Sequence, residues 1–213
     1  EIMSLEENMK NGKMFREYGH SDPKDIAYAK KLETLRITCK DKVFEYNHTI
    51  PSSQDTKKAI LKDLLGDCGE HIWIEAPMFF AYGCHTHIGD YFYANCHLTI
   101  IDDVDVYIGD HVMFGPNVTI AVTGHPLDKD YRLKAAHYSE TVTIGNNVWI
   151  GANAVILPGV SIGDNSVIGA GSIVTHDIPA SHLAYGNPCR VIREINEYDK
   201  VYFRKGKKVN EDW

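Results

Sequence analysis

Aliphatic residues recur at every sixth position in the second half of the chain. Isoleucine or valine stands at six successive places with this spacing, and glycine follows four of them; the places are 144, 150, 156, 162, 168 and 174. A period of six matches neither the 3.6-residue repeat of an α-helix nor the alternation of a simple strand. It is typical of a coil of short flat strands, in which one aliphatic side chain per strand points inward and a small residue lets the chain turn the corner.

The same spacing is present, more loosely, earlier in the chain. It includes the pairs Ile88-Gly89, Ala94-Asn95, Ile100-Ile101, Ile108-Gly109, Phe114-Gly115 and Ile120-Ala121. A shift of two residues before Ile108 indicates a small bulge in the coil. Residues 122–143 then interrupt the repeat with a polar stretch, which predicts a loop that projects from the coil and is available for function.

The chain before the coil has a helical pattern. Asp22-Pro23 is typical of a helix N-terminus and precedes apolar residues at helical spacing. A second helix is predicted from about Ser53 to Leu65, ending at Gly66. We therefore expect one structural unit with three parts: a helical cap over residues 1–70, a β-coil over 71–180, and a C-terminal tail over 181–213 that packs on the coil.

Composition narrows the class of protein. The 213 residues are 44% hydrophobic and 24% charged, as in a soluble globular protein with one sizeable core. The formal net charge of −7 argues against nucleic acid as a partner, because the net field repels phosphates. No apolar run is long enough for a membrane span and charges occur throughout the first thirty residues, so we expect neither a membrane partner nor a secretory signal.

Cysteine usage favours a cytoplasmic protein. The five cysteines are odd in number and contain no C-x-x-C pair, which argues against a disulfide framework or a zinc ribbon. The segment Cys84-His85-Thr86-His87 has metal-ligand residue types, but residues 85 and 87 of a flat strand share a face that residue 84 opposes. With no second pair at matching spacing, we predict no metal site there, and we expect Cys39, Cys68 and Cys96 to act as small apolar residues.

His125 is the strongest candidate for chemistry among the eleven histidines. It lies in the segment Thr123-Gly124-His125-Pro126 of the projecting loop, where packing does not require an imidazole. An imidazole with an ordinary pKa of about 6.5 is a suitable general base near neutral pH. On residue type alone, a loop histidine that makes one hydrogen bond is an equally good interpretation.

Several segments together resemble one protein family. They are residues 92–95, 98–100, 102–103, 123–126, 144–151 (IGNNVWIG) and 186–195 (GNPCRVIREI). The chain resembles the maltose/galactoside O-acetyltransferase branch of the hexapeptide acyltransferases from about residue 10 to residue 200, and residues 11–15 and 44–47 are most similar to its galactoside members. The resemblance implies an all-β fold, a left-handed parallel β-helix of hexapeptide repeats, with three hexads in each triangular turn.

The resemblance also implies a reaction. Members of this family transfer acetyl from acetyl-CoA, a co-substrate, to a sugar hydroxyl by direct attack, without a metal. His125 stands at the position of the general base, and the backbone N–H of Ala152 at the position that stabilises the oxyanion. The family further implies a homotrimer with active sites between subunits.

Binding residues follow from the same resemblance. Those matched to the sugar acceptor are Glu17, Arg36, Tyr93, Asn95, Asp103 and His137, and those matched to coenzyme A are Trp149, Ala152, Ala170, Thr175, His176, Arg190 and Arg193. From the residues alone, Tyr93 and Trp149 fit a packing role equally well, and Asp103 could merely turn a corner. His137 and His176 depart from the residues usual in the family, which leaves the acceptor and one phosphate contact open.

Three other functions would use parts of the same sequence pattern. An acetyltransferase with a non-sugar acceptor would share the coil and His125, and a non-catalytic interaction solenoid would share the coil alone. A γ-type carbonic anhydrase requires two histidines five residues apart, and the sequence has no such pair. The sequence does not identify the physiological sugar or the hydroxyl that receives the acetyl group.

Overall fold

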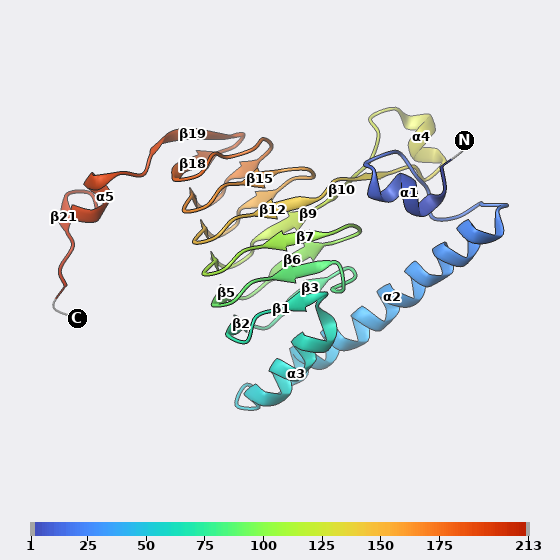
Figure 1. The fold of residues 1–213 in the computed structure, drawn as a ribbon, viewed down its shortest axis with the longest axis horizontal. Coiled ribbons are helices and arrows are strands. Elements are labelled where there is room, and N and C mark those ends of the chain that lie inside the picture. Colours follow the sequence, from blue (N-terminus) through green and yellow to red (C-terminus); the bar gives the residue numbers. More distant parts are fainter. Residues whose placement is uncertain (1–2, 212–213) are drawn as a thin grey trace.

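The chain winds into a triangular coil whose three walls are parallel β-sheets (Figure 1). The computed structural model describes residues 3–211. The first sheet contains β1 (Asp67–Cys68), β4 (Thr86–Ile88), β7 (Val106–Ile108), β12 (Val142–Ile144) and β15 (Ser161–Ile162). The second contains β2 (Ile72–Ile74), β5 (Phe92–Ala94), β8 (Met113–Phe114), β13 (Trp149–Ile150), β16 (Val167–Ile168), β18 (His182–Gly186) and β19 (Cys189–Glu194). The third contains β3 (Met78–Phe80), β6 (Leu98–Ile101), β9 (Thr119–Ala121), β14 (Val155–Ile156) and β17 (Ile173–Val174).

The six-residue period is the path of the chain from one wall to the next. Ile144, Ile150 and Ile156 lie in the first, second and third sheets in turn, and all three are buried inside the coil. In the next turn, Ile162 pairs directly with Ile144. Equivalent side chains therefore stack in columns, and the aliphatic residues of the repeat form one continuous core.

One corner of the coil is longer than the others. We call the corner between the third and first sheets the loop corner. The chain takes eight residues from Phe80 to Ile88 and again from Ile100 to Ile108, where a regular step takes six. The two-residue shift seen in the sequence therefore lies at this corner, between β6 and β7. One turn later, the projecting loop leaves the coil at the same corner.

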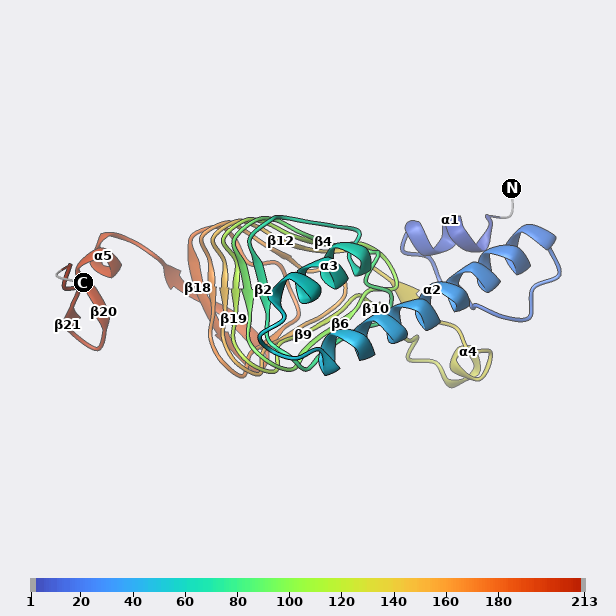
Figure 2. The same ribbon diagram turned by 90° about the horizontal axis from the view of Figure 1, so that it is seen from below.

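The projecting loop contains a short hairpin and a helix. Strands β10 (Thr123–Gly124) and β11 (Tyr138–Ser139) pair antiparallel, and α4 (Lys129–Leu133) lies between them. Viewed along the coil, β10 and α4 stand outside the triangle, beside α1 and α2 (Figure 2). The loop and the N-terminal helices thus meet outside the loop corner.

The N-terminal region consists of α1 (Leu5–Lys10), α2 (Pro23–His48) and α3 (Gln54–Leu64). The Asp22 side chain accepts a hydrogen bond from the Lys24 N–H and so caps α2, as its sequence predicts. Helix α2 continues for 26 residues, with buried residues at helical spacing as far as Tyr46. The sequence analysis gave no end for this helix and did not predict α1. The apolar face of α3 covers the first turn of the coil, whereas the first half of α2 extends beyond the coil to α1 (Figure 1).

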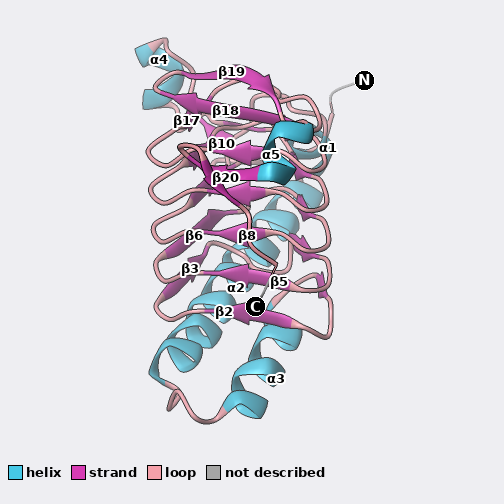
Figure 3. Ribbon diagram, turned by 90° about the vertical axis from the view of Figure 1, so that its left-hand side faces the viewer, coloured by secondary structure: helices cyan, strands magenta, loops and turns pink. Residues whose placement is uncertain are grey.

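The C-terminal tail packs on the coil only in part. Strand β18 continues the second sheet beside β16, and β19 folds back antiparallel on β18. After Glu194, helix α5 (Glu197–Val201) and the hairpin of β20 (Tyr202–Arg204) and β21 (Lys207–Lys208) extend away from the coil (Figures 1 and 3). We expected residues 181–213 to pack on the coil, and this is wrong for the described part after Glu194. None of residues 195–211 is buried. No helix within residues 3–211 has the length and apolarity needed to cross a membrane.

Candidate active site

The β10–β11 hairpin holds His125 in one tautomer. His125 follows β10 directly, and its Nδ1 lies 3.0 Å from the carbonyl oxygen of Ala136 in the opposite arm of the loop. Because a carbonyl can only accept a hydrogen bond, the proton of a neutral imidazole must be on Nδ1. The lone pair is therefore on Nε2, and the side chain is exposed. This is the form that a general base requires.

Two hydroxyl groups tie the base of this hairpin to the coil. The Thr123 hydroxyl donates to Oδ2 of Asp103 over 2.7 Å. The Ser139 hydroxyl lies 2.8 Å from Thr123 Oγ1 and therefore donates to it, since the Thr123 proton is already used. Ser139 is buried and Asp103 is half-buried at the loop corner. The position of His125 thus depends on the same carboxylate that was predicted to bind the acceptor.

His137 lies beside His125 and directly precedes β11, the second strand of the hairpin. The two ring centroids are 5.6 Å apart, and the Phe15 ring contacts His137 edge-on at 4.3 Å. Backbone hydrogen bonds in both directions join His137 to Phe15. Burial lowers the pKa of His137, against the opposing effect of the Glu17 carboxylate. The ring is therefore neutral near pH 7, and it leaves His125 without a neighbouring positive imidazole.

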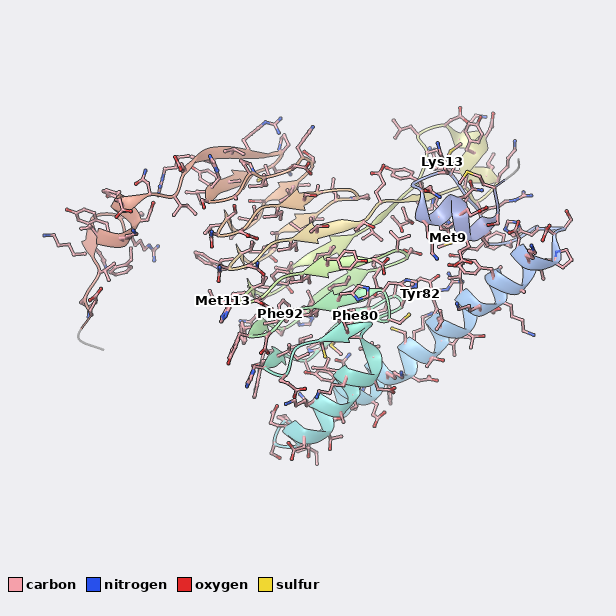
Figure 4. The ribbon with its side chains drawn as sticks, in the orientation of Figure 1. Met9, Lys13, Phe80, Tyr82, Phe92 and Met113 are labelled. Atoms are coloured by element: carbon pink, nitrogen blue, oxygen red, sulfur yellow. The ribbon has the colours of Figure 1, made fainter. Side chains whose placement is uncertain are left out.

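Glu17 and Arg36 form an ion pair next to this histidine pair. Arg36 Nη1 contacts Glu17 Oε2 and also donates to the Tyr82 hydroxyl over 2.7 Å. Burial raises the pKa of Tyr82, so the phenol keeps its proton. Tyr82 sits at the loop corner on the side of the coil that faces α1 and α2 (Figure 4). These side chains come from the N-terminal region and the coil, and they meet at the loop corner with Asp103, His125 and His137.

A second group of predicted residues lies elsewhere on the coil. A hollow of about 490 Å³, which we call the coil hollow, is centred on the corner between the second and third sheets. Its lining residues are Gly115, Pro116, Trp149, Gly151, Ala152, Val167, Ile168, Gly169, Ala170 and Leu183. The Ala152 N–H makes no hydrogen bond to any residue between 3 and 211, so it is available to an oxyanion.

Tyr93 and Asn95 belong to this second group. Tyr93 pairs with Met113, which pairs with Trp149 in the next turn, and these three outward side chains form one exposed column on the second sheet. Met113 marks this side of the coil in Figure 4, opposite Tyr82. Tyr93 therefore does not pack in the core, and neither does Trp149, which is 51% exposed. Asn95 lies at the same corner as Ala152, two turns earlier.

The remaining residues that were matched to coenzyme A lie outside the coil hollow. Thr175 and His176 follow β17, and the Thr175 hydroxyl is 2.8 Å from Nδ1 of His176. Arg190 is exposed on β19, whereas Arg193 makes two hydrogen bonds of 2.7 Å to the carboxylate of Asp199 in α5. In this structure the Arg193 guanidinium is thus already paired.

The chain matches known families over both its helical and its coiled parts. Residues 8–69 match the maltose acetyltransferase hexapeptide capping motif, and residues 141–176 match the six-repeat bacterial transferase hexapeptide. Over 207 residues the chain is 48% identical to the galactoside O-acetyltransferase of Escherichia coli (strain K12), which is 97% of each chain. The chain belongs to the family of hexapeptide-repeat maltose and galactoside acetyltransferases.

Solved structures of this family have the same fold. A galactoside acetyltransferase in complex with coenzyme A superposes with a TM-score of 0.89 at 47% identity, over 99% of this chain and 100% of that one. A hexapeptide-repeat acetyltransferase from Vibrio cholerae, complexed with acetyl coenzyme A, has a TM-score of 0.78 at 30% identity, over 92% and 100% of the two chains. The predicted parallel β-helix of hexapeptide repeats is confirmed, and the chain is an acyltransferase.

Three side chains that the sequence patterns did not indicate support the predicted site residues. Tyr82 accepts a hydrogen bond from Arg36, Phe15 packs on His137, and Ser139 donates to Thr123. Thr123 was quoted only as part of the His125 segment. These side chains act through contacts between segments that are distant in the sequence. Of the four, only Thr123 belongs to a local motif, Thr123-Gly124-His125-Pro126, that could have indicated its role. His87, considered as a metal ligand, instead bridges Asp67 and Asp105 with its two ring nitrogens.

Proposed function

We propose that this acyltransferase moves acetyl from acetyl-CoA to a sugar hydroxyl, and that Nε2 of His125 is the general base. The hydrogen bond from His125 Nδ1 to the Ala136 carbonyl carries this proposal, because it leaves an exposed imidazole with its lone pair on Nε2. Two of the relatives described above are galactoside acetyltransferases by name, which supports a sugar acceptor.

The reaction needs one proton transfer and one bond exchange. Nε2 takes the proton of the sugar hydroxyl while its oxygen attacks the thioester carbonyl, because a hydroxyl of high pKa is a poor nucleophile near pH 7. The tetrahedral intermediate collapses with loss of the coenzyme A thiolate, which takes up a proton. The products are the acetylated sugar and coenzyme A. No acyl-enzyme is needed, and burial raises the pKa of Cys39 to about 12, which makes that thiol a poor nucleophile.

The unpaired Ala152 N–H supports a role in stabilising the oxyanion of this intermediate. It opens into the coil hollow, which is mostly apolar and suits the pantetheine arm beside Trp149 and Ala170. Arg190 lies exposed farther along the same sheet, where a guanidinium suits phosphate oxygens. Arg193, Thr175 and His176 would join this contact only after rearrangement of the pairs they now form.

The acceptor would lie at the loop corner. Glu17 and Asp103 offer carboxylate oxygens to sugar hydroxyls, and Arg36 and Tyr82 offer donors. Asp103 already accepts from Thr123 through Oδ2, which leaves its Oδ1 for the acceptor. A neutral His137 borders the base without competing for its proton. The physiological sugar is not specified by these groups alone.

We further propose that each active site combines two copies of the chain in a cytoplasmic homotrimer. His125 lies on the projecting loop at the loop corner, whereas Ala152, Asn95 and the coil hollow belong to the corner between the second and third sheets. Leu127 and Leu133, near the tip of the projecting loop, are 96% and 82% exposed in the single chain. Apolar side chains so exposed favour contact with another subunit, and flat coil faces pack well around a threefold axis.

The test is acetyl transfer in a His125→Ala variant. Wild-type protein mixed with acetyl-CoA and a panel of sugars should release free coenzyme A, detected with a thiol reagent, only when a sugar is present. Loss of the base should lower this rate by about 10² to 10⁴-fold, while coenzyme A binding, measured by calorimetry, stays unchanged. His111→Ala, an exposed coil histidine, is the matched control.

Three outcomes would contradict the proposal. Wild-type turnover in His125→Ala would exclude this residue as the base. If wild type and His125→Ala released coenzyme A equally with no sugar present, sugar transfer would be excluded. Coenzyme A binding without transfer to any sugar would favour the non-catalytic or non-sugar alternatives, and a panel of amines and amino acids would separate those two.

A further inference from the structure

A second hollow lies along helix α2, next to the Glu17–Arg36 ion pair. It has a volume of about 510 Å³, within the range of about 300 to 1,000 Å³ typical of small-molecule sites. Its lining residues are Glu17, Tyr18, Ala29, Lys30, Glu33 and Arg36, and we call it the helix hollow. Two of these residues are the proposed acceptor contacts, whereas the resemblance and the comparisons assign no role to Tyr18, Lys30 or Glu33.

The polar wall of the helix hollow is longer than one sugar ring. Lys30, Glu33 and Arg36 are spaced three residues apart on α2, so successive members are neighbours on the helix surface, and all three line the hollow. Six residues at a rise of about 1.5 Å each place Lys30 about 9 Å along the helix axis from Arg36. A single ring held by Arg36 and Glu17 would leave the Lys30 end of the hollow unoccupied.

The groups at the far end suit a neutral polyhydroxylated ligand. Lys30 supplies only donors and Glu33 only acceptors, and the two charges offset each other. Neither side chain makes an ion pair with another residue of the described range 3–211, so both are available. Tyr18 is 66% exposed and presents an aromatic face of the kind that packs on the C–H face of a sugar ring. An anionic ligand would instead meet the carboxylates of Glu17 and Glu33.

We infer that the helix hollow is a second-ring subsite: the preferred acceptor carries a further sugar ring, which packs on Tyr18 and hydrogen-bonds to Lys30 and Glu33. This inference rests on the proposed function and adds the acceptor class to it, a disaccharide or longer glycoside. The ring that receives acetyl lies against Glu17 and Arg36, and the further ring contributes binding but no chemistry. It therefore acts on the KM of the acceptor.

The experiment compares matched acceptors in matched variants. Methyl glucoside with maltose and methyl galactoside with lactose are the acceptor pairs, and initial rates are measured at saturating acetyl-CoA. For the better pair, wild type should show a lower KM for the disaccharide. In Tyr18→Ala and in the double variant Lys30→Ala/Glu33→Ala, the disaccharide KM should rise about five- to tenfold, the effect of losing one or two polar or stacking contacts. The monosaccharide KM and both kcat values should stay unchanged.

Controls separate this inference from the proposed function. Lys40→Ala removes an exposed lysine of α2 outside the hollow and should change neither KM. His125→Ala should abolish transfer to both acceptors while calorimetry still detects disaccharide binding that Tyr18→Ala weakens. Equal KM values for the two acceptors in wild type, or equal changes for both in the variants, would overturn the second-ring subsite. Transfer to no sugar, with disaccharide binding that is intact and sensitive to Tyr18, would overturn the proposed function but not the subsite.

Discussion

Asp102 and Asp103 are adjacent in the chain and have different roles. Asp102 is fully buried, where its carboxylate accepts from the Tyr82 N–H and the Thr86 hydroxyl, each over 2.8 Å. It therefore joins two successive loop corners of the coil. Asp103 is half-buried and holds Thr123 at the base of the projecting loop. At the scale of single residues, the first carboxylate supports the fold and the second supports the site.

The buried carboxyl predicts a pH dependence of stability. Burial raises the pKa of Asp102 to about 6, whereas an unfolded aspartate titrates near pH 4. Because the folded state holds this proton more tightly, its contribution is fully present below about pH 4 and is lost as the pH rises through 6. In Asp102→Asn the side-chain amide does not titrate, so this loss of stability with rising pH is absent.

The measurement is urea unfolding of wild type and Asp102→Asn from pH 4 to pH 7.5. Both proteins carry His85→Gln, because Asp102 and His85 affect each other's pKa, and the difference between the two curves then isolates Asp102. The free energy of unfolding of the variant, relative to wild type, should increase between pH 4 and 6.5 and then level off. Parallel curves would show that Asp102 does not titrate in this range.

The Thr123 hydroxyl predicts a positioning role. Thr123→Val keeps the side-chain shape but leaves Asp103 and Ser139 without their shared partner. We expect kcat for acetyl transfer to fall about tenfold, since a small displacement of a catalytic group is costly, and the acceptor KM to rise as Asp103 moves. Thr123→Ser should recover most of both values. A Thr123→Val protein that loses stability but keeps kcat would indicate a purely structural role.

Among the elements, the coil corners combine close packing of neighbouring turns with the proposed coenzyme site. Gly151 has an ordinary backbone conformation, yet a Cβ at this position would lie 2.5 Å from the Ala170 nitrogen of the next turn. A Cβ at Gly115 would similarly lie 2.6 Å from the Ala152 nitrogen. Glycine is required here by the approach of neighbouring turns, and the same approach forms the wall of the coil hollow.

Gly151→Ala should therefore affect both stability and donor binding. The added methyl group forces the two turns apart, at a cost of about 1 to 3 kcal/mol in the free energy of unfolding. Displacement of Ala170 and Ala152 should also raise the KM for acetyl-CoA. Gly171→Ala is the comparison, because a Cβ there meets nothing within 4 Å and strains only its own backbone, at φ +73°. An unchanged KM for acetyl-CoA in Gly151→Ala would argue against the coil hollow as the donor site.

At the scale of the whole molecule, one chain keeps its two groups of site residues apart. The loop corner gathers the proposed base with Glu17, Arg36 and Asp103. The corner between the second and third sheets gathers the proposed oxyanion and coenzyme residues, together with Asn95, which was predicted to contact the acceptor. The helical cap and the projecting loop widen the molecule on one side, and β18 and β19 lie on the other (Figure 2). The proposed active site between two chains would bring these two groups together.

Subunit complementation tests that division. His125→Ala and Asn95→Ala should each be nearly inactive alone. If one chain supplies His125 and its neighbour supplies Asn95, then mixing the two in equal amounts, with unfolding and refolding, should restore about a quarter of wild-type activity, because one site in four receives both intact residues. If both residues act from the same chain, the mixture should gain no activity.

The parts of the fold differ in how well they could be predicted from the sequence. The columns of Ile144, Ile150 and Ile156 follow from a strict local period, so the coil was predicted well. The start of helix α2 was predicted from Asp22-Pro23, but its end was not, because its second half packs on the coil through only a few residues, such as Cys39, Val43 and Tyr46. The tail after Glu194 was misjudged, since nothing in its composition shows whether it lies on the coil or away from it.

By itself, the sequence determined the coil, the family and the residue types that carry the proposed chemistry, because the period and the motifs are local and can be read along the chain. Only the tertiary structure decided that Glu17, Arg36, Asp103 and His125 share one corner while Ala152 belongs to another. Successive turns of the coil have similar sequences. A residue can therefore be assigned to a corner only when the pairing register of the strands is known. Hydrogen bonds across distant segments, such as Thr123 to Asp103 and His125 to Ala136, then set the direction of each side chain.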